Sequence, residues 1–220
     1  MSTALITGAS RGLGLALAHA LQDRGWQLVL AARGHAGLTS AAPRGAVLVA
    51  GDVTDPDHRA QLHTAVAQLG RLDLLVNNAS ELGPMPALVD YPLADLRRVF
   101  EVDVFAPLAL IGLLLPLLTE GASVVNVSSD AAVGAYGGWG GYGSAKAALD
   151  QLSAVLAVEQ PGLRVQAFDP GDMRTAMHQQ AFPGEDISDR PPPETVVPSL
   201  LRLLELPSGR YRASELAVTA

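Results

Sequence analysis

Short apolar runs alternate with longer stretches of helical periodicity along most of the chain. This alternation is typical of repeated strand and helix units, in which helices cover both faces of a parallel sheet. The sequence therefore predicts an α/β fold, a doubly wound parallel sheet of about seven strands. We expect the strands at residues 4–7, 27–32, 46–50, 73–77, 123–128, 164–168 and 209–213.

One helix has clear signals at both ends. In "DPDHRAQLHTAVAQLG", Asp55 can cap the first turn, Pro56 suits the first helical position and Gly70 can end the run. The gap after the second expected strand, "RGHAGLTSAAPRG", is too short and too rich in Gly and Pro for a full helix. We expect helices in most of the other gaps.

The chain has no internal repeat, linker or low-complexity segment, and its 220 residues suit one α/β domain. We therefore expect residues 1–220 to form a single domain. Residues 171–193 make up the one long irregular stretch. We expect them to form a loop over a functional site, the substrate loop.

Composition excludes several classes of function. The chain has no cysteine, which excludes disulfides and thiolate chemistry, and its five histidines lack ligand spacing, so we expect no metal site. A net charge of -7 without a basic cluster argues against nucleic-acid binding. The N-terminus lacks the basic region of a signal peptide, and the apolar run 104–118 is shorter than the roughly 20 residues that span a bilayer. We expect a cytoplasmic protein that does not enter a membrane.

Apolar residues make up 49% of the chain and charged residues only 17%, below the roughly 25% charged that is usual for soluble domains. A surface with so few charges favours burial between subunits. We expect a homodimer or homotetramer, with the helices near residues 104–118 and 142–160 at the interface.

A glycine-rich turn, "TGASRGLG" at residues 7–14, follows the first expected strand and opens the first expected helix. Glycines allow a tight turn and close approach of the backbone to a pyrophosphate, whose charge the N-H groups of a helix N-terminus can bind. Such a turn alone is weak evidence, because glycine serves any tight turn. Its place in the first strand and helix unit strengthens it.

The spacing TGxxxGxG resembles that of the short-chain dehydrogenase/reductase family, and "GDV", "NNA", "NVSS", "YGSAK" and "PGDMRT" are similar to its other landmarks, in the same order. The resemblance implies a Rossmann fold with NAD(P) at the carboxyl ends of the strands. It also implies that the cofactor contacts come from Gly8, Ser10, Arg11, Gly12, Leu13, Gly14, Arg33, Asp52, Val53, Asn78, Ala79, Tyr142, Lys146, Pro170, Gly171, Met173 and Thr175.

The choice between NAD and NADP depends on the end of the second strand. An acid there binds the ribose 2′-OH of NAD, whereas a 2′-phosphate needs a cation. The chain has Ala32 at the acid's position and Arg33 next, with Ser10 and Arg11 as further donors in the glycine turn. We expect NADP(H) to be preferred, with NAD(H) as the alternative.

The same resemblance implies a catalytic group of Ser129, Tyr142 and Lys146. Tyrosine has a pKa of about 10, so a nearby ammonium that stabilises the phenolate makes it a better proton acceptor at neutral pH. We assign Tyr142 as general acid/base, Lys146 as the residue that lowers its pKa and holds the nicotinamide ribose, and Ser129 as the hydrogen-bond partner of the substrate oxygen. Ser128 is the rival for that last role.

Two residues depart from the family pattern. Asp103 replaces the helix asparagine that usually completes the proton relay, and Ser80 replaces the commoner glycine of "NNAG". An ionised Asp103 would partly offset Lys146, whereas a protonated side chain, or one turned away, would not. We expect the change at Ser80 to be minor.

The expected activity is transfer of a hydride between NADP(H) and a carbonyl or secondary alcohol. The alternatives are a catalytically silent NADP(H) sensor and, ranked last, an epimerase or dehydratase that uses the bound cofactor. Candidate walls of the pocket for the small-molecule substrate are Tyr136, Trp139, Met173, Met177 and His178. Trp139 suits a subunit interface equally well.

Overall fold

A computed structural model of the chain describes residues 1–217, so the last three residues of the expected domain lie outside the described part. The strands form one sheet of seven parallel strands in the order β3-β2-β1-β4-β5-β6-β7. Their bounds are β1 Thr3–Thr7, β2 Gln27–Ala32, β3 Val47–Ala50, β4 Leu72–Asn77, β5 Leu118–Val127, β6 Arg164–Asp169 and β7 Gly209–Arg212. This is the predicted α/β Rossmann fold, and every expected strand overlaps an observed one.

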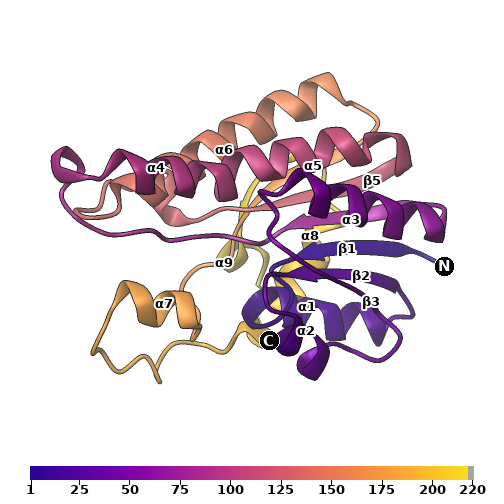
Figure 1. Cartoon of the computed structure of the whole chain (residues 1–220), viewed down its shortest axis with the longest axis horizontal. Helices are drawn as coiled ribbons and strands as arrows, with labels where there is room; N and C mark the ends of the chain where they lie inside the picture. Colours follow the sequence, from indigo (N-terminus) through magenta and orange to yellow (C-terminus); the bar gives the residue numbers. More distant parts are fainter. Residues whose placement is uncertain (218–220) are drawn as a thin grey trace.

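Helices lie on both faces of the sheet (Figure 1). Their bounds are α1 Gly12–Gln22, α2 His35–Ala41, α3 Pro56–Leu69, α4 Leu93–Phe100, α5 Ala106–Leu114, α6 Gly140–Glu159, α7 Ala176–Ala181, α8 Val197–Leu203 and α9 Ala213–Leu216. A π-helical turn, Glu101–Phe105, joins α4 to α5. Single 3-10 turns lie at Leu88–Asp90, Leu115–Leu117, Asp130–Ala132 and Pro193–Thr195.

The sheet separates two apolar cores, and β1 shows why its strands are apolar at every position. Ala4 and Ile6 pack toward α1 and α8, whereas Leu5 packs toward α3 and α5. Successive side chains of a strand point to opposite faces, so a strand covered on both sides needs apolar residues throughout. All five residues of β1 are buried.

The chain order reverses between β1 and β4, because β1 continues to β2 on one side and β4 continues to β5 on the other. The carboxyl ends of parallel strands at such a switch point leave a crevice that binds ligands in open α/β sheets. The glycine turn follows β1 and the "NNA" segment follows β4, so both lie at this edge.

The end signals of α3 are confirmed. The Asp55 side chain accepts a hydrogen bond of 2.9 Å from Asp57 N, Pro56 occupies the first turn, and Gly70 ends the helix with a φ of +82°. Two expectations about irregular segments are wrong in part. The gap after β2 contains the seven-residue helix α2, and residues 171–193 contain the six-residue helix α7.

The apolar run 104–118 belongs to a longer helical stretch, Leu93–Leu117, because α4, the π-helical turn and α5 are continuous. These 25 residues are long and apolar enough to cross a membrane, judged by length and composition alone. Half of the most apolar window is buried inside the structure. The expectation that this apolar segment is too short to span a membrane is therefore wrong. Its burial inside the structure is the observation that favours a core helix.

Candidate active site

The glycine turn after β1 is shaped by close backbone contacts. A Cβ atom on Gly8 would lie 2.8 Å from Asn78 Nδ2, and one on Gly14 would lie 2.6 Å from the same atom. Gly8 and Gly12 also have positive φ angles of 65° and 59°, which side chains with a Cβ rarely adopt. The turn therefore needs glycine at these positions, as the sequence predicted.

The "NNA" segment supports this turn. Asn78 Nδ2 donates to Thr7 O at 2.9 Å and to Gly8 O at 3.2 Å, while the backbone N-H groups of Asn78 and Ala79 both donate to Thr7 Oγ1 at 3.0 Å. The Asn78 amide thus fixes the shape of the loop. This contact gives the residue a structural role at the place where the sequence predicted a cofactor contact.

The N-terminus of α1 is suited to an anion. Arg11 occupies its N-cap position without a side-chain cap, and the first turn carries no acid. Uncapped N-H groups at a helix N-terminus bind phosphate groups well. The Leu13 side chain is buried in the core, so only its backbone can face a pyrophosphate. With the glycine cradle, these residues fit the diphosphate of NAD(P).

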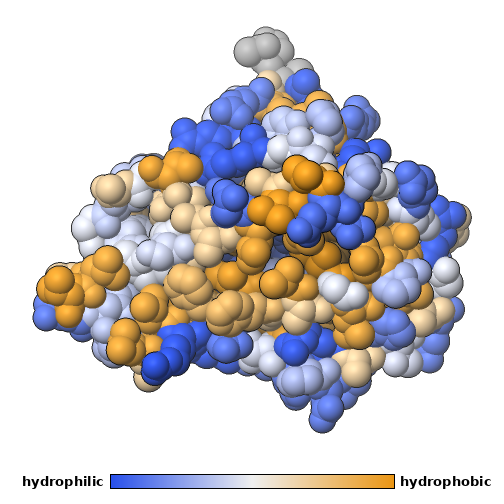
Figure 2. All heavy atoms as spheres, turned by 90° about the horizontal axis from the view of Figure 1, so that it is seen from above, coloured by the Kyte–Doolittle hydropathy of each residue, from blue (hydrophilic) through white to orange (hydrophobic). Residues whose placement is uncertain are grey.

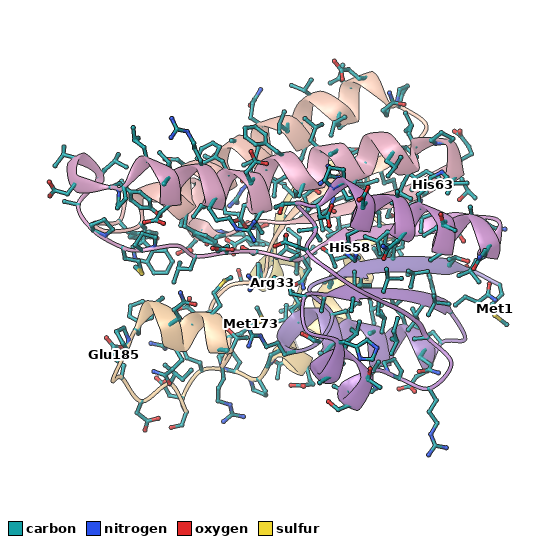
Figure 3. The ribbon with its side chains drawn as sticks, viewed as in Figure 1. Met1, Arg33, His58, His63, Met173 and Glu185 are labelled. Carbon is teal, nitrogen blue, oxygen red and sulfur yellow. The ribbon has the colours of Figure 1, made fainter. Side chains whose placement is uncertain are left out.

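Arg33 lies just beyond the end of β2, in the middle of the view in Figure 3. Its side chain is 63% exposed, and its guanidinium lies 3.6 Å from Glu81 Oε2. Arg98 contacts the same Glu81 oxygen at 3.3 Å and Asp52 Oδ2 at 2.6 Å. The rim of the predicted adenosine site therefore carries a network of ion pairs of alternating sign, in the order Arg33, Glu81, Arg98 and Asp52.

Asp52, expected at the adenine, is already bound within the protein. Its Oδ1 accepts from Thr54 N at 2.9 Å and Thr54 Oγ1 at 2.8 Å. Burial alone would raise its pKa, but the hydrogen bonds from Thr54 and Arg98 lower it from 3.8 to about 2. Val53 packs against Val102 and Ala106. The role of both residues at the adenine stays a prediction.

The chemical end of the site lies on α6 and at the end of β5. Tyr142 and Lys146 are 8% and 2% exposed, and Lys146 Nζ lies 5.4 Å from the centre of the Tyr142 ring. Lys146 Nζ donates to Val127 O at 2.9 Å. The Ser129 hydroxyl lies near Tyr142 and lowers the tyrosine pKa. The structure thus brings together the three side chains predicted from the sequence.

The structure also separates Ser129 from its rival. Ser128 Oγ is buried and has no hydrogen-bond partner among the described residues. Ser129 Oγ, by contrast, accepts from Ala131 N at 3.1 Å, donates to Asp130 Oδ1 at 3.0 Å and faces Tyr142. The geometry favours Ser129 over Ser128, because the Ser129 hydroxyl acts on Tyr142 and the buried Ser128 hydroxyl does not.

Comparison with known proteins shows the family of this chain. The family model for short chain dehydrogenase matches residues 2–186. The chain belongs to the short chain dehydrogenase family. A short chain dehydrogenase from Shigella flexneri complexed with NADP shares 28% sequence identity, with a TM-score of 0.91 and 97% of each chain covered. A short chain dehydrogenase from Escherichia coli complexed with NADPH shares 29% sequence identity, with a TM-score of 0.90 and 96% of each chain covered.

L-fucose dehydrogenase from Oryctolagus cuniculus is a relative with an assigned activity. It is 34% identical over 182 residues, which are 80% of this chain. The chain spans 64% of the length of that relative.

Asp103, the first departure from the family pattern, is fully buried on the π-helical turn. Its Oδ1 lies 2.9 Å from Lys146 Nζ and also accepts from the Ser80 hydroxyl, and its Oδ2 accepts from Glu81 N at 3.2 Å. The side chain is therefore not turned away from Lys146. Ser80 is not a minor departure, because its hydroxyl binds Asp103 directly.

Several groups act on the pKa of Tyr142. Burial raises it most, Lys146 lowers it, Asp103 raises it, and the hydroxyl groups of Ser80 and Ser129 lower it, with a net increase above 10. Burial is the largest single influence on the pKa of Lys146 and would lower it, but the attraction and hydrogen bond of Asp103, with the attraction of Tyr142 and Asp150, together raise it. In this structure the phenol therefore carries its proton at neutral pH, the state that a proton donor requires.

The substrate loop approaches both ends of the site. A Cβ on Gly12 would lie 3.7 Å from Thr175 Cγ2, so the start of α7 lies beside the glycine turn. Farther on, Met177 packs with Tyr142, and Phe182 lies 6.0 Å from Trp139, measured between ring centres. Trp139 in turn contacts Tyr142 edge-on at 6.0 Å. Trp139 and Met177 are thus placed as expected for walls of a pocket.

The other expected wall residues are placed differently. Tyr136 is 49% exposed and donates to Asp130 Oδ2 at 3.0 Å. Met173 packs against the core that contains α1, and Figure 3 shows it on the same side of the molecule as Arg33. His178 stacks on Phe182. The remaining predicted cofactor residues, Pro170 and Gly171, follow β6, and Gly171 has a φ of +73°.

Sequence reasoning missed the charged residues that join these parts, Glu81 and Arg98. Glu81 directly follows the "NNAS" segment, but its partners Arg33 and Arg98 lie on other elements, so only the fold shows the network. No group of three potential metal ligands was found within residues 1–217.

His58 was also missed. Its ring is buried beneath Gly51, and neither ring nitrogen has a hydrogen-bond partner within residues 1–217. Burial lowers its pKa below 6.5, although the nearby Asp55 and Asp52 act in the opposite direction. The folded chain therefore binds a proton at His58 less readily than the unfolded chain does.

This difference predicts an acid-sensitive stability. The contribution of His58 is fully present above the unfolded pKa of 6.5 and is lost as the pH falls from there toward the lower folded pKa, at no more than about 1.4 kcal/mol per pH unit. Urea unfolding of the wild type and of His58→Leu between pH 7.5 and 5.5 measures it. The variant should lose less free energy of unfolding over that range, and equal losses would contradict the prediction.

Proposed function

We propose that the protein is an NADP(H)-dependent oxidoreductase that transfers a hydride between the nicotinamide and a carbonyl or secondary alcohol, with Tyr142 as general acid/base. The observation that carries the proposal is the group of buried Tyr142, buried Lys146 and half-buried Ser129 at the carboxyl edge of the sheet, beside the glycine turn. A protein that only binds the nucleotide needs the turn but not this group.

Each residue of the group has a distinct role in the proposal. Ser129 donates a hydrogen bond that orients the substrate oxygen, and Tyr142 gives its proton to that oxygen during reduction or removes it during oxidation. Lys146 stabilises the phenolate and holds the nicotinamide ribose. When bound, the cofactor supplies or accepts the hydride.

NADP(H) is proposed over NAD(H) because Ala32 stands at the position of the acid that binds the 2′-OH of NAD, and the cation Arg33 follows it. The two structural relatives complexed with NADP and NADPH support this preference. The diphosphate is assigned to the backbone of residues 8–14, with Ser10 and Arg11 as donors, and the nicotinamide side to Thr175 and its neighbours.

A cofactor assay tests the proposal. We expect the absorbance of NADPH to fall when the purified protein is mixed with NADPH and a suitable member of a panel of aldehydes, ketones, quinones and diketones. Trp139 and Met177 beside Tyr142 suit small substrates with an apolar part. Tight NADPH binding without turnover of any panel member would favour the alternative, a catalytically silent sensor.

We further propose that the chain is one cytoplasmic domain that assembles as a homodimer or homotetramer. Exposed apolar side chains gather on the face formed by α5, α6 and the turns that flank α5 (Figure 2). They are Phe105, Leu108, Leu113, Leu115, Val155 and Val158. Such a patch marks an interaction surface. Sedimentation at two or four times the chain mass of 22.8 kDa would support the assembly, and sedimentation at the chain mass would refute it.

A further inference from the structure

The two departures from the family pattern, Ser80 and Asp103, lie in contact with each other. Ser80 follows β4, and Asp103 lies on the π-helical turn between α4 and α5, 23 residues along the chain. The Ser80 hydroxyl nevertheless donates to Asp103 Oδ1. The two residues are far apart in the sequence, but the fold brings them into contact with each other near Tyr142.

The contacts of Asp103 are those of an ionised carboxylate. Oδ1 accepts from Ser80 and from the Lys146 ammonium, and Oδ2 accepts from the Glu81 N-H. The Lys146 ammonium and the Glu81 N-H can only donate, and they occupy both carboxyl oxygens, which favours the ionised form. The negative charge is therefore held 2.9 Å from the ammonium that acts on Tyr142.

Ser80 also reaches the reacting group. The Ser80 hydroxyl lowers the pKa of Tyr142, whereas the Asp103 charge raises it. The helix that carries Asp103 packs against α6 through Val99, Val104 and Ala145, which keeps these groups in register. Besides Asp103, the other carboxylate that acts on Lys146 is Asp150, farther along α6.

We propose that Ser80 and Asp103 act as one positioning unit for Tyr142, in which Ser80 fixes the carboxylate against Lys146 and moderates its effect on the phenol. The proposal rests on the proposed acid/base role of Tyr142. Neither residue is assigned a contact with substrate. Ser80 and Asp103 stand where the family usually carries glycine and asparagine. In the proposed unit the Ser80 hydroxyl offsets part of the Asp103 charge, and Asp103 provides the acceptor for that hydroxyl.

The test is a double-mutant cycle of Ser80→Gly, Asp103→Asn and the double variant. Ser80→Gly removes the donor that moderates the carboxylate, so the tyrosine ionises at higher pH. Asp103→Asn removes the negative charge, so Tyr142 should ionise at a pH lower by about one unit, a shift that is typical of one close charge. In the Asp103→Asn background, Ser80→Gly should have a clearly smaller effect, because its main partner is gone.

Two readouts follow the cycle. The basic limb of kcat against pH measures ionisation during turnover. Carbon-13 NMR of tyrosines labelled at Cζ, with the Tyr142 signal assigned from Tyr142→Phe, measures it in the protein without substrate. At one alkaline pH the phenolate fraction should fall in Ser80→Gly and rise in Asp103→Asn. If the wild type turns over no substrate, the proposed function fails while the NMR cycle still tests the unit.

Ser80→Thr is the matched control, because it keeps the hydroxyl and should keep the wild-type profile. Asp103→Asn has almost the same shape as the native residue, and thermal melting identifies any variant that does not fold. A Ser80→Gly shift of equal size in both backgrounds, or no shift at all, would overturn the proposal. Shifts of the two single variants in the same direction would overturn it as well.

Discussion

Tyr142→Phe should lower turnover roughly a hundredfold or more while leaving the affinity for NADPH unchanged, because general acid/base groups contribute about that much. The ring packs against Leu82, Ala131 and Trp139, and phenylalanine keeps that packing. Only the hydroxyl, and with it the transferable proton, is removed. Steady-state kinetics with the best substrate of the panel and a fluorescence titration with NADPH measure the two quantities.

Tyr211→Phe is the matched control for this experiment. Tyr211 lies on β7, and its hydroxyl donates to the backbone of Pro207 at 3.2 Å rather than to any group of the site. We expect near wild-type turnover from it. If Tyr142→Phe retained turnover as well, the pair Tyr142 and Lys146 would have to be reassigned to a structural role.

Arg33→Ala should remove most of the preference for NADPH over NADH. A charge-assisted contact with a phosphate is worth roughly 1.5 to 3 kcal/mol, or between ten- and a hundredfold in affinity. Arg33 is 63% exposed and has to leave Glu81 to bind a phosphate, so we expect about tenfold, the low end of that range. Titrations of both cofactors at one fixed salt concentration measure the change, because salt screens exposed charges.

The control here is Arg24→Ala. Arg24 is also exposed, but it follows the C-terminal end of α1, the end opposite the glycine turn. The Arg24→Ala variant also removes one positive charge, but it leaves the predicted phosphate site intact. The preference for NADPH over NADH should therefore not change. Equal affinities of the wild type for the two cofactors, or an unchanged preference in Arg33→Ala, would refute the assignment of Arg33.

The fold was predictable because its signals are local. Strands buried on both faces must be apolar at nearly every position, and this pattern located all seven strands to within a few residues, except at the start of β5. The start of β5 at Leu118 was missed, because Thr119, Glu120 and Gly121 interrupt the apolar pattern in the first half of the strand. Helix α2 was missed because glycines and a nearby proline hide its two turns.

The candidate site was predictable only where it follows motifs. The glycine turn and the group of Tyr142, Lys146 and Ser129 came from spacing, and the structure brings each of them to the expected edge. The contact of Ser80 with Asp103 has no such signal, because it joins two elements that are neighbours only in space. The same is true of Glu81 with Arg33 and Arg98.

Glu81 has a consequence for attempts to convert the protein to NADH. The usual change would place an acid at position 32 or 33, where it could bind a ribose hydroxyl. At position 33 that acid would stand opposite Glu81, which the native arginine now contacts at 3.6 Å, and the two like charges would repel. Neutralising Glu81 would in turn leave Arg98 with Asp52 as its remaining ion-pair partner, while the backbone N-H of Glu81 holds Asp103. Coenzyme conversion therefore has to be designed over residues 33, 81 and 98 together, with the ionisation of Tyr142 measured in every design.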